Sequence, residues 1–269
     1  MTTTETTTTA AAPARPMRNL TEHLDKLWGL VGFIIILTVW HVSVIVFDIS
    51  NLLLPSPGAV FAEMIERAPQ LGKNALITLR EILTGYALAV IVGTSLGIAL
   101  AFSRILSRIV YPVLVIGNSV PKVALAPLLL VWIGFGSTTS SFLAMLVAVF
   151  PMVINTVLGL TSIDQNLIKL GRVMGGNAFR IFWKVRLPTA LPSIFAGLKL
   201  SITLATIGAV VGELIAGQGG LGYMSQFMAG QLEMEATFAA IVVLSAMGVT
   251  LFYLIVWLEY LVIPWRRGA

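Results

Sequence analysis

Six long apolar stretches dominate this chain and restrict what it can fold into. They lie at 28–47, 76–102, 109–133, 140–160, 193–215 and 237–258. Each is close to the roughly 20 residues that a helix needs to cross a bilayer. The chain is 57% hydrophobic and only 11% charged, whereas soluble domains carry about 25% charged residues. The sequence therefore predicts an all-α, polytopic membrane protein with six transmembrane helices.

The distribution of lysine and arginine predicts the orientation of these helices. Loops that stay in the cytoplasm carry an excess of both residues. If the N-terminus is inside, the predicted cytoplasmic segments hold most of the basic residues, and the external segments hold Arg67 and Lys73. The net charge of +5 then reflects topology and does not indicate a nucleic-acid partner. We expect a multi-pass protein of the cell (inner or plasma) membrane, surrounded by membrane lipid, with both termini in the cytoplasm.

The predicted domain boundaries follow from this topology. We expect a disordered cytosolic tail at 1–20, a first transmembrane helix with an external amphipathic segment at 21–74, and a transmembrane domain at 75–260. A cytosolic tail at 261–269 completes the chain. Within the external segment, Ser56 and Pro57 are typical of a helix start, and they predict a short helix over 59–68.

Two spans contain rows of small residues that recur every four positions. Such rows allow neighbouring helices to approach closely in a membrane. The rows are Ala89, Gly93, Gly97 and Ala101, and Gly208, Gly212 and Ala216.

The third predicted span, 109–133, combines prolines with a lysine. It contains Pro112, Pro121 and Pro127, which predict one kinked helix. Lys122 would lie about 20 Å into the span at 1.5 Å per residue, where a charge is costly unless it is paired or hydrated. Lys122 is therefore expected either to face a translocation path or to join an ion pair, for which Glu213 is a possible partner. Glu81, near the external end of its span, is expected to extend to the interface.

The longest polar run between apolar stretches lies at 164–192. Leu167, Leu170 and Met174 share one face of a predicted helix over 166–174. The pair Gly175-Gly176 is expected to end that helix.

A second short helix is expected to follow that glycine pair. Asn177 is a typical N-cap for it. Pro188 and Pro192 are expected to end this second helix and to bend the chain.

The spacing in this run resembles the EAA loop of ABC importer permeases. That pattern is E-A-A, three residues, G, nine residues, I-x-L-P. The sequence has Lys169-Leu170-Gly171, three residues, Gly175, nine residues, and Val185-Arg186-Leu187-Pro188. Lys169 replaces the usual Glu, and Gly171 replaces the second Ala. A Gly-Leu-Gly-Tyr run after Glu213 is also similar to the family, and the resemblance extends from about Leu54 to the C-terminus.

The resemblance implies a type I ABC importer permease fold, closest to permeases for nitrate, sulfonates, taurine and related small solutes, including vitamin precursors. It implies three kinds of partner: ABC ATPase subunits that hold the cytosolic loop 161–192, an extracytoplasmic solute-binding protein or lipoprotein, and a second copy of the chain. The residues implied in ATPase coupling are Asp164, Lys169, Leu170, Gly171, Arg172, Gly175, Gly176, Leu187 and Pro188. Lys122 and Glu213 are the candidates for the translocation path.

The sequence offers no catalytic chemistry of its own. It contains no G-x-x-x-x-G-K-[ST] phosphate loop, no cysteine, and no spacing typical of a metal site. We therefore expect no enzyme activity, no metal and no cofactor in this chain, with ATP and Mg bound by the partner ATPase. Three alternatives remain: a basic loop that only fixes topology, an ion-coupled secondary transporter, and a membrane assembly factor that does not transport.

Overall fold

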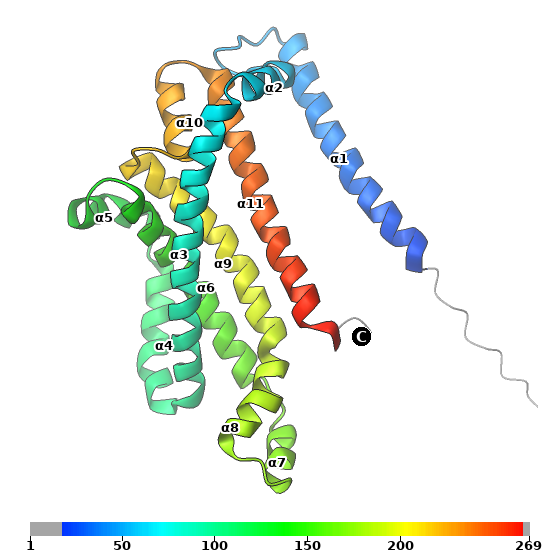
Figure 1. Ribbon diagram of the computed structural model, residues 1–269, viewed down its shortest axis with the longest axis vertical. Coiled ribbons are helices and arrows are strands. Elements are labelled where there is room, and N and C mark those ends of the chain that lie inside the picture. The colour runs from blue at the N-terminus through cyan, green and yellow to red at the C-terminus, as the bar shows by residue number, and fades with distance from the viewer. Residues whose placement is uncertain (1–17, 266–269) are drawn as a thin grey trace, which may run out of the picture. The chain divides into compact units, whose positions relative to one another are not determined.

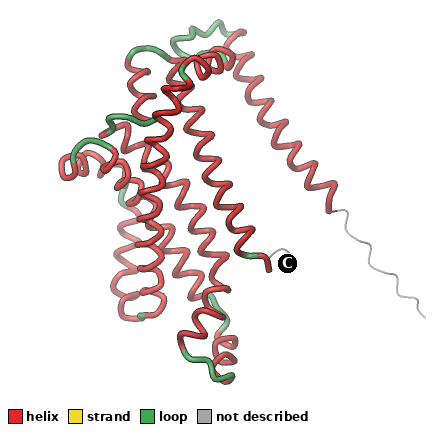
Figure 2. The backbone as a smooth tube through the Cα atoms, in the orientation of Figure 1, coloured by secondary structure: helices red, strands yellow, loops and turns green. Residues whose placement is uncertain are grey.

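The computed structural model describes residues 18–265, and every regular element in that range is helical (Figures 1 and 2). The predicted all-α fold is confirmed. Most of the predicted N-terminal tail and the end of the C-terminal tail lie outside the described residues. The chain divides into two compact units, Met1–Ser50 and Asn51–Ala269. The first unit contains α1 (Arg18–Val46).

Four helices of the described range are long and apolar enough to cross a membrane. They are α3 (Ala68–Phe102), α6 (Ser137–Thr161), the helical run Ala178–Ala216 that ends in α9 (Leu187–Ala216), and α11 (Met234–Val262). They correspond to four of the six predicted spans. The first predicted span falls in α1. The apolar part of α1, Ile34–Val46, is shorter than the four long helices, so the prediction that α1 crosses the membrane stays a prediction.

The third predicted span is not one kinked helix. It consists of α4 (Arg104–Ser119) and the short 3₁₀ helix η1 (Lys122–Leu125), followed by α5 (Ala126–Ile133). The two halves, Arg104–Ser119 and Lys122–Ile133, are bent by 85°, a geometry found in broken spans and re-entrant loops. The break falls at Pro121 because the residue before a proline is pushed out of the helical region, and Val120 is indeed extended. Pro112 stays inside α4.

The core of the second unit is built on α6, which packs between α3 and α9. The small residues of α3 and α9 make this contact possible, as predicted. A Cβ atom on Gly93 would lie 2.7 Å from Met152 Cβ, and one on Gly208 would lie 2.7 Å from Ala144 Cα. Ala101, at the end of the predicted row, is only partly buried. The rows therefore set how closely the three central helices approach.

Short helices lie at the two ends of the second unit (Figure 1). One end carries α2 (Pro57–Glu66) and α10 (Leu221–Gly230). The predicted start of α2 is confirmed, because Ser56 accepts a hydrogen bond from the Ala59 amide at 3.3 Å. The other end carries α7 (Gln165–Val173), α8 (Ala178–Ile181) and the π-helical turn η2 (Phe182–Arg186), which leads into α9.

Candidate functional site

The polar loop begins with a capped helix. The Asp164 carboxylate accepts a hydrogen bond from the Asn166 amide at 2.8 Å, which starts α7. After α7, the Asn177 side chain accepts from the Arg180 amide at 2.8 Å and caps α8 as predicted. Both caps use side-chain oxygens to satisfy amides that a helix start leaves without partners. The loop is therefore a pair of defined helices.

Helix α7 turns its apolar side chains outward. Ile168 is the buried residue of this helix, and it packs with Ile163, Ile181 and Val185. Leu167, Leu170 and Met174 share a face, as the spacing predicted, but that face is exposed: Met174 is 79% accessible. Because Ile168 is the buried residue of α7, the other apolar side chains of this helix form an exposed apolar surface at the tip of a polar loop.

The turn after α7 is a Schellman motif, in which the first residue beyond the helix cap is left-handed. Gly175 has a φ of +78°, and its amide donates to the Arg172 carbonyl at 3.0 Å. The Gly176 amide donates to the Gly171 carbonyl at 2.9 Å. A Cβ on Gly176 would lie 2.6 Å from that carbonyl oxygen, whereas one on Gly171 would make an ordinary 3.4 Å contact with Ile181. The two glycines are thus needed for different reasons. Gly175 adopts the left-handed backbone conformation, and Gly176 allows the backbone to pass close to the Gly171 carbonyl oxygen.

The expected helix end at Pro188 and Pro192 is wrong. The chain is helical without interruption from Ala178 to Ala216, over 39 residues. The π-helical turn just before Pro188 explains how the helix continues: the Leu187 amide donates to the Phe182 carbonyl, five residues back. Such a widened turn accommodates a proline, which has no amide hydrogen and whose ring crowds the preceding turn. Leu187 and Pro188 therefore form the first turn of α9 and join the loop rigidly to a span.

The structure does not bring Lys122 and Glu213 together. Lys122 lies at the break between α4 and α5. Its amine donates to the carbonyl and side-chain oxygens of Asn118 at 3.0 and 2.9 Å, and it lies 4.5 Å from the centroid of the Phe150 ring. Among the described residues, neither Lys122 nor Glu213 takes part in an ion pair. The suggestion that the two residues pair is wrong.

Glu213 instead lies fully buried near the end of α9. One carboxylate oxygen accepts a hydrogen bond from the Gly222 amide at 2.6 Å. The carboxyl group of Glu81 lies beside that of Glu213. Glu81 is only 2% accessible, so the expectation that it extends to the interface is wrong. One oxygen of each carboxyl group, Oε2 of Glu81 and Oε1 of Glu213, is buried without a hydrogen-bond partner among the described residues.

Helix α3 holds the same glycine-rich turn from its other side. The Asn74 side chain accepts a hydrogen bond from the Gly220 amide at 2.9 Å, and the Thr78 hydroxyl accepts from the Leu221 amide at 2.8 Å. We missed these residues in the sequence, although 74, 78 and 81 fall at i, i+4 and i+7 in a mostly apolar span. That spacing places three polar side chains on one helix face. The turn after α9 is therefore fixed to both α3 and α9.

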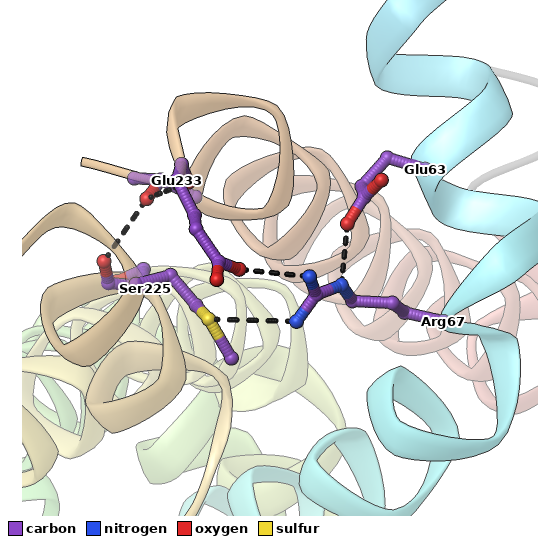
Figure 3. A network of polar contacts seen from close by, with 6 residues as sticks. Glu63, Arg67, Ser225 and Glu233 are labelled. Atoms are coloured by element: carbon purple, nitrogen blue, oxygen red, sulfur yellow. Dashed lines mark hydrogen bonds and ion pairs between the residues drawn. The ribbon is translucent and has the colours of Figure 1, made fainter. Parts of the chain in front are cut away.

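An ion-pair network joins α2 to the start of α11 at the same end (Figure 3). Arg67 contacts the Glu63 carboxylate through Nε, and its Nη2 atom lies 2.8 Å from the Glu233 carboxylate. Nη1 of the same residue contacts the Met228 sulfur of α10 at 3.7 Å. Through Arg67, the network connects α2, α10 and the start of α11 at this end of the central helices.

Comparison with known proteins shows that the chain is similar to inner membrane components of transport systems. Residues 85–267 match the family model described as "Binding-protein-dependent transport system inner membrane component". The chain is 33% identical to the formylaminopyrimidine transport permease protein ThiX of Halalkalibacterium halodurans over 87% of this chain and 94% of ThiX. It is 35% identical to the riboflavin transport system permease protein RibX of Chloroflexus aurantiacus over 88% of this chain and 90% of RibX.

A solved structure shows the same fold at lower sequence identity. The chain superposes on a chain of the MetNI methionine ABC transporter, in an inward-facing conformation, with a TM-score of 0.62 and 22% identity. The match covers 74% of this chain and 97% of the other.

Proposed function

This chain belongs to the family of binding-protein-dependent transport system inner membrane components, and we propose that its loop 161–192 is the part that a separate ATPase holds and moves. The chain is the permease subunit of an ABC importer. The alternative of an ion-coupled secondary transporter is therefore set aside. The partners, the orientation and the coupling residues are our proposal.

The observation that carries the proposal is the exposed apolar face of α7. Leu167 and Leu170 are 46% and 56% accessible, and Val173 is 85% accessible. These side chains stand beside Asp164, Lys169 and Arg172, which belong in water and not in lipid. An apolar patch in polar surroundings indicates a protein partner. A groove on an ATPase subunit would bury this patch.

The helical continuity of the loop with α9 supports its use as a lever. The run Ala178–Ala216 is one helix of 39 residues, which is about 58 Å long at 1.5 Å per residue. It begins beside α7 and ends at Glu213 and the glycine-rich turn. A displacement of the loop by ATP binding or hydrolysis would therefore reach the opposite end of the protein. We propose that a solute-binding protein or lipoprotein delivers substrate at that end, and that two copies of the chain enclose the path.

Orientation and chemistry complete the proposal. We propose that this loop, and with it both termini, lies in the cytoplasm, because the basic residues of 161–192 favour that side under the positive-inside rule. ATP and Mg²⁺ would be bound by the ATPase, since this sequence lacks a phosphate loop motif. The names of two similar relatives, for formylaminopyrimidine and riboflavin, favour a small organic solute over an inorganic anion such as nitrate.

Co-purification tests the docking step. Replacing Leu170 with Ser should reduce the amount of ATPase that co-purifies with the permease about 10-fold or more, because burial of a leucine contributes roughly 1.5–3 kcal/mol. The matched control is Leu76→Ser, which alters a 67% accessible leucine of α3 at the opposite end. Equal ATPase recovery from both variants would refute the docking surface.

A further inference from the structure

A basic pocket lies beside the loop, between the turn from α3 to α4 and helix α7. It has a volume of about 690 Å³. Four arginines line it: Arg104 and Arg108 from α4, Arg172 from α7, and Arg186 from η2. Segments that lie far apart in the sequence thus bring four positive charges to one concave surface.

The arginines lack compensating charge within the part of the chain that the structure describes. None of the residues lining the pocket is acidic, and none of the four arginines forms an ion pair with a described carboxylate. Four guanidinium groups around one cavity repel each other, and a bound anion would relieve that repulsion. The electrostatics of the pocket therefore suit an anion.

The geometry of the pocket favours a phosphate group. Guanidinium groups donate paired hydrogen bonds that match phosphate oxygens. Arg186 is held in place because its guanidinium carbon lies 4.9 Å from the centroid of the Phe102 ring. Ser107, Thr161 and Gln165 add further polar groups to the wall.

The position of the pocket favours a lipid as the carrier of that phosphate. Its apolar wall is formed by Leu100, Phe102 and Leu160, which belong to the last turns of α3 and α6. The pocket therefore lies where two membrane spans end, at the depth of lipid headgroups. Basic pockets between transmembrane helices are known to hold anionic headgroups.

The pocket is distinct from the apolar surface proposed for the ATPase, although Arg172 belongs both to the pocket and to the proposed coupling residues. Ile168 and Arg172, which line the pocket, are four residues apart and share one face of α7. Leu167, Leu170 and Met174 occupy the opposite face, and they do not line the pocket. An ATPase can therefore cover one face of α7 while a lipid occupies the other.

We propose that this pocket binds the phosphate group of an anionic phospholipid such as phosphatidylglycerol. The bound headgroup bridges α4 to α7 and η2, and so steadies the base of the loop against the membrane. Placing this lipid in the cytoplasmic leaflet rests on the proposed orientation, but binding itself does not.

The test uses the purified full-length permease and native mass spectrometry with added phosphatidylglycerol or phosphatidylcholine. Phosphatidylglycerol should be retained in preference to phosphatidylcholine. The double variant Arg104→Gln/Arg108→Gln should bind it about 30-fold more weakly, since each basic residue near a lipid surface contributes on the order of 1 kcal/mol. The matched control is Arg180→Gln/Lys184→Gln, which removes two charges from the loop 161–192 at positions that do not line the pocket and should retain the lipid.

Three outcomes would overturn the proposal. Equal retention of phosphatidylglycerol by the double variant and the wild type would show that the pocket does not hold the lipid. Arginine-dependent binding of inorganic phosphate without lipid retention would overturn the lipid as the source. A double variant that keeps the lipid but loses its ATPase would mark the pocket as a protein interface. Loss of the ATPase from Leu170→Ser, by contrast, tests only the proposed function.

Discussion

The Gly176 amide donates a hydrogen bond to the Gly171 carbonyl oxygen at 2.9 Å, and this bond closes the turn between the two short helices of the loop. The two glycines contribute unequally to it. Gly176 has no room for a Cβ atom, which would lie 2.6 Å from the Gly171 oxygen, whereas Gly171 has an ordinary contact distance of 3.4 Å available. A substitution of Gly176 can therefore be tested against a control substitution of Gly171, at the other end of the same hydrogen bond.

Replacing Gly176 with Ala should impair transport, and replacing Gly171 with Ala should not. The added methyl group at 176 would force the turn open at a cost of about 1–3 kcal/mol, which would move α8 relative to α7. Solute uptake should fall about 10-fold while the amount of inserted protein stays normal. Uptake by vesicles and quantification of the membrane-inserted chain would provide both measurements. Equal uptake by both variants would show that transport does not depend on the close contact between residue 176 and the Gly171 carbonyl.

Gly175 allows a second test, which concerns the backbone conformation of the turn and not the room for a side chain. A Cβ on Gly175 would meet open space, but the φ of +78° is unfavourable for β-branched residues and tolerable for asparagine. Gly175→Val should therefore abolish transport in a chain that still inserts, because the strain is on the order of 1–3 kcal/mol. Gly175→Asn should retain most of the uptake. Loss of uptake to the same extent in both variants would point to a different cause than backbone strain.

Much of the fold could be predicted from composition and periodicity. Apolar stretches of membrane-spanning length, the rows at Gly93 and Gly208, and the caps at Ser56 and Asn177 depend on local chemistry, which a sequence displays directly. The bend at Pro121 was harder, because proline permits both a gentle kink and a complete break. The π-helical turn before Pro188 was missed because nothing in the local sequence distinguishes a helix that stops at a proline from one that widens around it.

The site depended more on tertiary context. The periodicity of α7 identified Leu167, Leu170 and Met174 as one face, but it could not say that Ile168 is the residue buried against Ile181. Glu81 and Glu213 lie 132 positions apart in the sequence numbering, so only the packing of α3 and α9 around α6 could join them. The charge of Lys122 suggested an ion pair, and the Asn118 oxygens supply its partners instead.

The two buried carboxyl groups should respond to substitution in opposite ways. Glu213→Ala would leave the buried Gly222 amide without its acceptor, which costs about 1–3 kcal/mol. Glu81→Gln would remove the contact between two acids while keeping the shape of the side chain, so stability should be unchanged or improved. Thermal unfolding of the purified permease in detergent would measure both effects.

The control for that pair of variants is Glu66→Ala, which changes an exposed glutamate at the end of α2 and should leave the unfolding temperature unchanged. A destabilised Glu81→Gln variant would show that both carboxyl groups are needed, for example because each accepts bonds that glutamine cannot replace.

The ion pair between Arg67 and Glu233 should contribute modestly and in a salt-dependent way. The two side chains are 31% and 40% accessible, and exposed pairs contribute about 0.2–1 kcal/mol. A double-mutant cycle with Arg67→Gln and Glu233→Gln should give a coupling energy in that range at low salt. The coupling should decrease in about 1 M KCl, because salt weakens the interaction between charges that are exposed to solvent. A coupling that is absent at low salt, or insensitive to KCl, would contradict an electrostatic role.

The same pair should be insensitive to pH in the neutral range. Burial lowers the pKa of Arg67, but the hydrogen bond and charge of Glu63 and the charge of Glu233 outweigh it and raise that pKa above its ordinary value. A group whose pKa is raised on folding stabilises the protein below its unfolded pKa, and the effect is lost only as the pH rises through the folded value. Arg67 therefore stays charged, and the coupling energy should be constant from about pH 6 to pH 9. Repeating the cycle at both ends of that range measures this, and a coupling that disappears at the alkaline end would mean that a group other than Arg67 carries the interaction.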